Sequence, residues 1–166
     1  MEINIADDRH VITDYDKETY LEAMMAESDL QLPIIMKNGL TIVCRDLNMY
    51  EREVSIEIAK RKIANKELPA HLIMSTLRDI RLPMQIVSIN DKKFRTVRLE
   101  YDPESSSDKF EKDMEYLIKQ SKATLMRIPS SLQSLYMKAL NIFEHKLARL
   151  EEAAFNSDFW NPVGRD

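Results

Sequence analysis

The chain has 166 residues, of which 44% are hydrophobic and 31% charged, and its formal net charge is −4. These values suit one soluble domain, alone or with an appended helical arm, and no apolar run approaches the roughly 20 residues that cross a bilayer. Two glycines are too few for a phosphate loop or a dinucleotide-binding fingerprint, and the acidic start does not resemble a signal peptide, so we expect a cytoplasmic protein.

The lead segment, residues 1–29, is strongly acidic. It holds nine acidic residues against Arg9 and Lys17, a net charge of −7. Such a segment either docks on the mildly basic remainder or stays solvated, and we favour solvation. Within it, residues 16–28 predict one short helix, whose apolar side is Tyr20, Leu21, Met24 and Met25.

Residues 30–47 predict a β-hairpin. Two apolar, partly β-branched runs flank Asn38–Gly39, a dipeptide in which both residues tolerate positive φ. Cys44 is the only cysteine and is in phase with Leu40 and Ile42. We therefore interpret it as a small buried residue rather than a nucleophile.

Two amphipathic helices are expected next. Asn48 and Glu51 have the spacing of a capping box at the start of the first helix. The second helix is expected to begin at Pro69, a good first-turn residue, and to end at Pro83. The apolar side of the first helix is formed by Tyr50, Val54, Ile58 and Ile63, and its basic side by Arg52, Lys60, Arg61, Lys62 and Lys66. The second helix is expected to bury Leu72, Ile73, Leu77 and Ile80.

Residues 84–102 predict a second pair of strands, formed by the runs 84–89 and 95–101. In the later run, apolar and polar residues alternate with the period of a half-buried strand. Its inward residues are Val97, Leu99 and Tyr101. The sequence DPESSSD that follows is the clearest linker and our candidate domain boundary.

The remainder of the chain is expected to be helical. Asp108 and Glu111 have the spacing of another helix cap, and Pro129 separates two amphipathic helices. A short break of this kind predicts an antiparallel helical hairpin that packs on the first domain or on a partner. The apolar face of the first helix is Phe110, Met114, Leu117, Ile118 and Leu125.

The second helix carries a narrow apolar seam whose residues recur at alternating spacings of four and three, which is typical of a helix packed against another helix. An aromatic tail follows, and it either caps its own helices or anchors a partner. The predicted partner-binding residues are Tyr136, Leu140, Phe143, Leu147, Leu150, Phe155, Phe159 and Trp160.

The expected fold is therefore α+β. A small β-hairpin and helix domain occupies residues 30–103, and an antiparallel helical hairpin occupies residues 104–154. The acidic lead segment 1–29 precedes them, and the aromatic C-terminal tail 155–166 follows.

Nothing in the sequence assembles a catalytic or metal site. His10, His71 and His145 lie far apart and without ligand spacing, so we expect a non-enzymatic chain with no metal and no cofactor. Two basic runs, 59–66 and 91–98, offer phosphate contacts, but the chain as a whole is acidic. We therefore expect a protein partner rather than nucleic acid.

Two segments resemble tailed-bacteriophage proteins of the tail-assembly chaperone and baseplate-assembly type. In those proteins a short hairpin ends in an Arg-x-Leu phrase and leads into a helix carrying Glu or Arg; the matching residues here are Leu32, Pro33, Gly39, Arg45, Asp46, Leu47 and Glu51. The closing segment is similar in its proline-started helix, leucine seam and terminal aromatic phrase, carried by Ile128, Pro129, Leu132, Phe143, Glu144, Leu147, Leu150, Phe159 and Trp160.

The resemblance implies a non-enzymatic protein of the infected bacterial cytoplasm. Such chaperones bind the long tape-measure protein, keep its apolar helices from aggregating, and help tail tube subunits gather around it. Within the same class, the alternative is a structural neck or baseplate component of the virion. The alternative from another class is a small nucleic-acid-binding regulator that uses the basic face of residues 60–66. The sequence also leaves open whether the chain forms a homo-oligomer.

Overall fold

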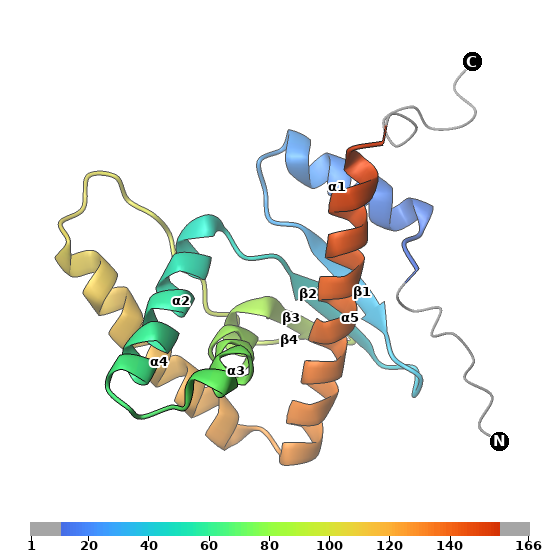
Figure 1. The fold of residues 1–166 in the computed structure, drawn as a ribbon. Helices are drawn as coiled ribbons and strands as arrows, with labels where there is room; N and C mark the ends of the chain where they lie inside the picture. Colours follow the sequence, from blue (N-terminus) through green and yellow to red (C-terminus); the bar gives the residue numbers. More distant parts are fainter. Residues whose placement is uncertain (1–10, 157–166) are drawn as a thin grey trace.

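The computed structural model describes residues 11–156 (Figure 1). In chain order its elements are α1 (Asp14–Met25), β1 (Gln31–Ile35), β2 (Thr41–Arg45), α2 (Met49–Ala64), a 3-10 turn at Ala70–Leu72, α3 (Ile73–Gln85), β3 (Ile86–Ile89), β4 (Lys92–Lys93), α4 (Asp108–Arg127) and α5 (Ser130–Ala154). The strands form one antiparallel sheet in the order β1-β2-β3-β4. The predicted α+β class is confirmed. None of the helices within residues 11–156 is long and apolar enough to cross a membrane.

The predicted hairpin is confirmed as β1 and β2, with Leu32 opposite Cys44 and Ile34 opposite Ile42. All four side chains are buried on one face of the sheet. Only Gly39 of the turn dipeptide takes a positive φ, +84°, so the loop relies on its glycine and not on both residues. Cys44 is buried as predicted, and burial raises the pKa of its thiol.

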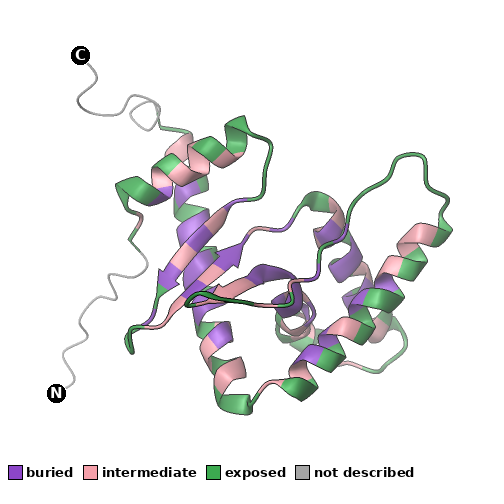
Figure 2. Ribbon diagram, turned by 180° about the vertical axis from the view of Figure 1, so that it is seen from behind, coloured by how far each residue is buried: buried purple, intermediate pink, exposed green. Residues whose placement is uncertain are grey.

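The first hydrophobic core lies between this face of the sheet and α5, which packs across β1 and β2 (Figures 1 and 2). Because strand residues alternate while helix residues return every three or four positions, both elements present continuous apolar stripes to one another. The helical arm was expected to pack either on the first domain or on a partner. Its second helix, α5, packs on the hairpin of the first domain.

The second hydrophobic core lies between α2, α3 and α4. Residues 128–129 join α4 to α5, and α3 contacts both of these helices. The core is built from Leu47, Val54, Ile58, Ala59, Leu77, Ile80, Met84, Val97, Leu99, Met114 and Leu117. Because α4 enters the second core and α5 the first, the two consecutive helices are held by different neighbours.

The buried hydroxyl of Ser121 ties α4 to α3 by donating a hydrogen bond of 3.0 Å to the carbonyl oxygen of Ile80. We expect Ser121→Ala to lower the free energy of unfolding by about 0.5–1.5 kcal/mol, because one buried hydrogen bond between the helices is lost. Urea denaturation followed by circular dichroism measures this, with the exposed Ser134→Ala on α5 as control. A change within the error of the control would contradict this role.

Several local predictions are wrong, and the first concerns α3. Pro83 does not end this helix, which runs on to Gln85. A proline in the last turn forfeits one intrahelical hydrogen bond, and here the buried Pro83 gains a contact, since its carbonyl oxygen accepts a hydrogen bond of 2.8 Å from the Val97 amide. Leu72 lies in the 3-10 turn and is exposed rather than on the inner face.

The run 95–101 is not a strand. Val97 and Leu99 are buried as predicted, but Tyr101 is exposed, and the strand that pairs with β3 is the short β4. The backbone of this run bonds to other acceptors, since the amide of Leu99 donates to the Glu51 carboxylate at 3.2 Å. The amides of the two buried residues, Val97 and Leu99, thus find acceptors without a sheet ladder.

The two predicted helix caps have different outcomes. The capping box of Asn48 and Glu51 is confirmed at the start of α2. The cap of Asp108 and Glu111 is wrong, because α4 begins after Ser107 with no side-chain cap. Ile118, expected on the inner face of α4, is exposed.

The expectation that the acidic lead stays solvated is wrong for its described part. α1 packs on α5 and β1, with Tyr20 and Leu21 partly buried against the first core. Met24 and Met25, expected on the apolar side, are exposed instead.

Candidate protein-interaction site

The apolar seam of α5 belongs to the protein's own core. Tyr136, Leu140, Phe143, Leu147 and Leu150 are between 0% and 4% exposed. These five residues were predicted to bind a partner, and the structure corrects that prediction, because β1, β2 and the elements around them already cover the seam.

The end of α5 differs from its seam. Phe155 caps the helix and is 93% exposed. Phe159 and Trp160, the other two predicted anchors, lie outside the described residues. At the same end of the molecule α1 ends in two exposed methionines, Met24 at 51% and Met25 at 85% (Figure 1). This end of the fold therefore presents large apolar side chains to solvent.

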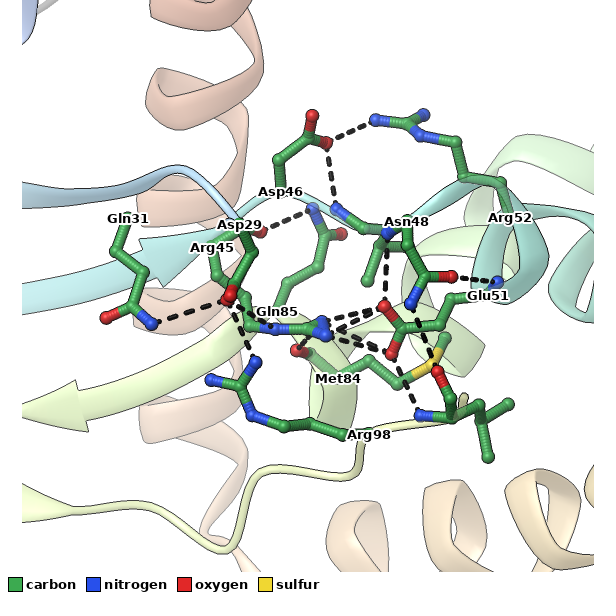
Figure 3. A network of polar contacts seen from close by, with 12 residues as sticks. Asp29, Gln31, Arg45, Asp46, Asn48, Glu51, Arg52, Met84, Gln85 and Arg98 are labelled. Atoms are coloured by element: carbon green, nitrogen blue, oxygen red, sulfur yellow. Dashed lines mark hydrogen bonds and ion pairs between the residues drawn. The ribbon is translucent and has the colours of Figure 1, made fainter. Parts of the chain in front are cut away.

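A buried ion pair organises the region below this end (Figure 3). Arg45 at the end of β2 and Glu51 in the first turn of α2 are 2% and 0% exposed, and the shortest distance between their charged atoms is 2.7 Å. The guanidinium also donates to the Met84 carbonyl oxygen at 3.1 Å, and Glu51 accepts from the amides of Asn48 and Leu99. One pair thus joins the hairpin, α2, the end of α3 and the run 95–101.

Asp29 and Arg98 extend this network of ion pairs from Arg45 towards the surface. The Asp29 carboxylate lies 3.3 Å from Arg45 Nε and 2.9 Å from Arg98 Nη1. Burial alone would raise the pKa of Asp29, but the hydrogen bonds from Arg98 and Gln31 and the charges of both arginines outweigh it and lower that pKa. Burial raises the pKa of Glu51, and the charge of Arg45 offsets that effect only in part.

Sequence reasoning assigned Glu51 to a cap and gave Arg45 no contact. The sequence did contain a signal for this pair. Two opposite charges flank the turn between the strand and the helix, and Arg45 lies on the face of the strand opposite to that of the inward-facing Cys44. The polar groups of Arg45 and Glu51 contact each other, Asp29 and the backbone, so the pair is a structural joint.

A pocket of about 550 Å³ opens beside this network. It lies between α1, the C-terminal half of α5, and the start and end of the hairpin. Its lining includes six carboxylate side chains, from Glu27, Asp29, Asp46, Glu51, Glu100 and Glu151, against the two arginines Arg45 and Arg98. Asp29, Asp46 and Glu51 are already paired with arginines. Basic side chains of a partner would therefore meet chiefly Glu27, Glu100 and Glu151.

α1 closes one side of this pocket and is held by a second buried ion pair. Lys146 Nζ on α5 lies 2.9 Å from Asp16 Oδ2, and both residues are less than 10% exposed. Asp16 also completes the capping box of α1 with Thr13. The same carboxylate therefore both starts the helix and docks it.

The other sequence candidates are not brought together. His71 and His145 are exposed and His10 lies outside the described residues; within residues 11–156 no group of three potential ligands is placed to hold a metal. On the basic face of α2, Arg61 is engaged by Glu111 at 2.7 Å and by Glu57 at 3.2 Å. These carboxylates offset part of the charge that a phosphate backbone would need.

Comparison with known proteins gives no further guidance, because no family model, curated protein or solved structure matches this chain.

Proposed function

We propose that the chain is a non-enzymatic protein-binding factor that acts in bacteriophage tail assembly as a chaperone for the tape-measure protein, in the host cytoplasm. The tail-assembly part of this proposal comes from the resemblance of the hairpin and closing segments. The protein-binding part is carried by one observation, the exposed apolar side chains at the ends of α1 and α5, Met24, Met25 and Phe155. Large apolar side chains exposed together at one end of a fold support an interaction site there.

The first resembling segment supports the proposal through folding. Its Arg45 and Glu51 form the buried joint, and Asp46 is paired with Arg52. These residues fix the hairpin against α2 and so set the scaffold on which α1 and α5 lie. The client-contacting groups are then expected in the second segment, which leads to Phe155, Phe159 and Trp160.

Co-expression tests the proposal directly. The chain is produced together with the tape-measure protein encoded in the same genome, and the solubility of the client and its co-elution are measured. We expect a soluble complex and no trace of the chain in purified virions. A client that stays insoluble and unbound would contradict the proposal, and presence in virions would instead favour a neck or baseplate component.

The aromatic end provides a mutational test. We expect Phe155→Ala combined with Phe159→Ala and Trp160→Ala to weaken client binding by about tenfold or more, because aromatic anchors dominate interfaces. The described member of the set is 93% exposed, so stability should change by only about 0.5 kcal/mol. Titration of the client and thermal melts measure the two effects.

Met126→Ala is the matched control, since Met126 is 80% exposed and lies in the last turn of α4, at the opposite end of the fold (Figure 1). If the triple variant instead loses several kcal/mol of stability, as a truncated buried aromatic does, the tail is part of the core and the assignment is wrong.

A further inference from the structure

The attachment of α1 to the rest of the fold is unusual for an amphipathic helix. Such a helix normally buries an apolar stripe. Here the one buried residue of α1 is the charged Asp16, whereas Tyr20, Leu21 and Ala23 are only partly buried against the first core. Below α1, Leu147 of the seam is 4% exposed. The groove beneath α1, between α5 and β1, borders the apolar first core, and the apolar side chains of α1 fill it only in part.

The groove has a charge requirement at one end. Lys146 is 8% exposed, and its ammonium group is paired with Asp16 from α1. A buried lysine is costly unless a carboxylate accompanies it. Any helix that takes the place of α1 therefore needs an acidic residue at the position of Asp16.

The other end of the groove is incompletely filled. The acidic pocket of about 550 Å³ lies beside Tyr20, Ala23, Met24 and Glu27, on the side of α1 that faces α5 and the hairpin. A replacing segment that follows the path of α1 and of the turn after it would hold the residues eight and eleven positions after its carboxylate, at the sites of Met24 and Glu27, against this pocket. Basic side chains at those two positions would complement its carboxylates.

We propose that the groove beneath α1 is a helix-binding site, which α1 occupies in the free protein and from which an amphipathic partner helix displaces it. The partner helix carries a carboxylate opposite Lys146 and basic residues eight to eleven positions later. This inference rests on the proposed function in that the client supplies the helix. The seam residue Leu147 then contacts the partner only after α1 has left.

A labelled synthetic peptide of residues 11–28 is the probe, and the full-length chain carrying Asp16→Lys is the receptor. In this variant α1 is repelled by Lys146 while the groove keeps its own residues, so a larger fraction of the molecules is competent to bind. We expect fluorescence anisotropy to show binding at least about tenfold tighter than to the unmodified chain.

Peptide variants test the charge requirements. The peptide with Asp16→Asn should bind the variant chain about tenfold more weakly, and the peptide with Met24→Lys and Glu27→Lys should bind it more tightly than the original. Equal binding of all three peptides would overturn the proposal, since the site would then be a non-specific apolar surface.

Thr13→Ala in the full chain is the control for the loss of the helix cap, because it removes the partner of the Asp16 amide and keeps the pair with Lys146. Its peptide affinity should stay close to that of the unmodified chain. The proposal is overturned if it matches Asp16→Lys, or if Asp16→Lys exposes the whole first core to hydrogen exchange. A probe that binds while the tape-measure protein does not would refute only the proposed function.

Discussion

Glu51→Gln is expected to lower the free energy of unfolding by about 3–5 kcal/mol, because it leaves the buried charge of Arg45 with only the partly exposed Asp29 as a counter-ion. Arg45 and Glu51 are 2% and 0% exposed, so water cannot replace the lost carboxylate. Urea unfolding followed by circular dichroism measures the loss. Glu53→Gln on the exposed side of the same helix is the matched control and should change stability by about 0.5 kcal/mol at most.

The double variant Arg45→Met with Glu51→Met separates the pair from its surroundings. An apolar pair of similar volume removes both charges together, so the double variant should be less destabilised than Glu51→Gln alone. If the single and double losses are simply additive, the two side chains do not depend on each other and the joint described above is wrong.

Leu140→Asp combined with Leu147→Asp is expected to unfold the chain. Both leucines are 4% exposed, and each substitution removes buried apolar volume and adds a carboxylate with no partner, at a cost of about 3 kcal/mol or more. Together the two changes approach the whole stability of a typical domain, about 5–15 kcal/mol. Far-ultraviolet circular dichroism and hydrogen exchange of α5 measure the loss.

Asn141→Asp with Ala148→Asp places the same two charges one residue further along the same helix, on exposed positions. This control should melt like the unmodified chain. A normal spectrum and an unchanged melting temperature for the leucine variant would show that the seam faces solvent.

Much of the local fold follows from the sequence because local rules decide it. The hairpin at Gly39, the capping box of Asn48 and Glu51, and the face of α5 all depend on residues within one or two turns of each other. The α+β class follows from their order. The errors occur where a distant group satisfies the backbone, as when Pro83 accepts the bond from Val97.

The sequence predicted less of the candidate site than of the fold. Periodicity identifies which face of α5 is buried but carries no information on what buries it, so a core seam and a partner seam have the same pattern. The docking of α1 depends on Lys146 meeting Asp16 across 130 positions of sequence, a pairing that no local rule indicates. The partner-binding role predicted for Phe155 stays a prediction, and the exposure of its side chain fits the alternative in which the tail anchors a partner.

Hydrogen exchange of the chain bound to the tape-measure protein tests the central claim, that the end formed by α1 and the C-terminus of α5 receives the client. We expect protection of residues 155–166 and faster exchange of residues 11–28 on binding, with the second core unchanged. Protection confined to the basic face of α2, or unchanged exchange of residues 11–28 and 155–166 in the complex, would contradict it.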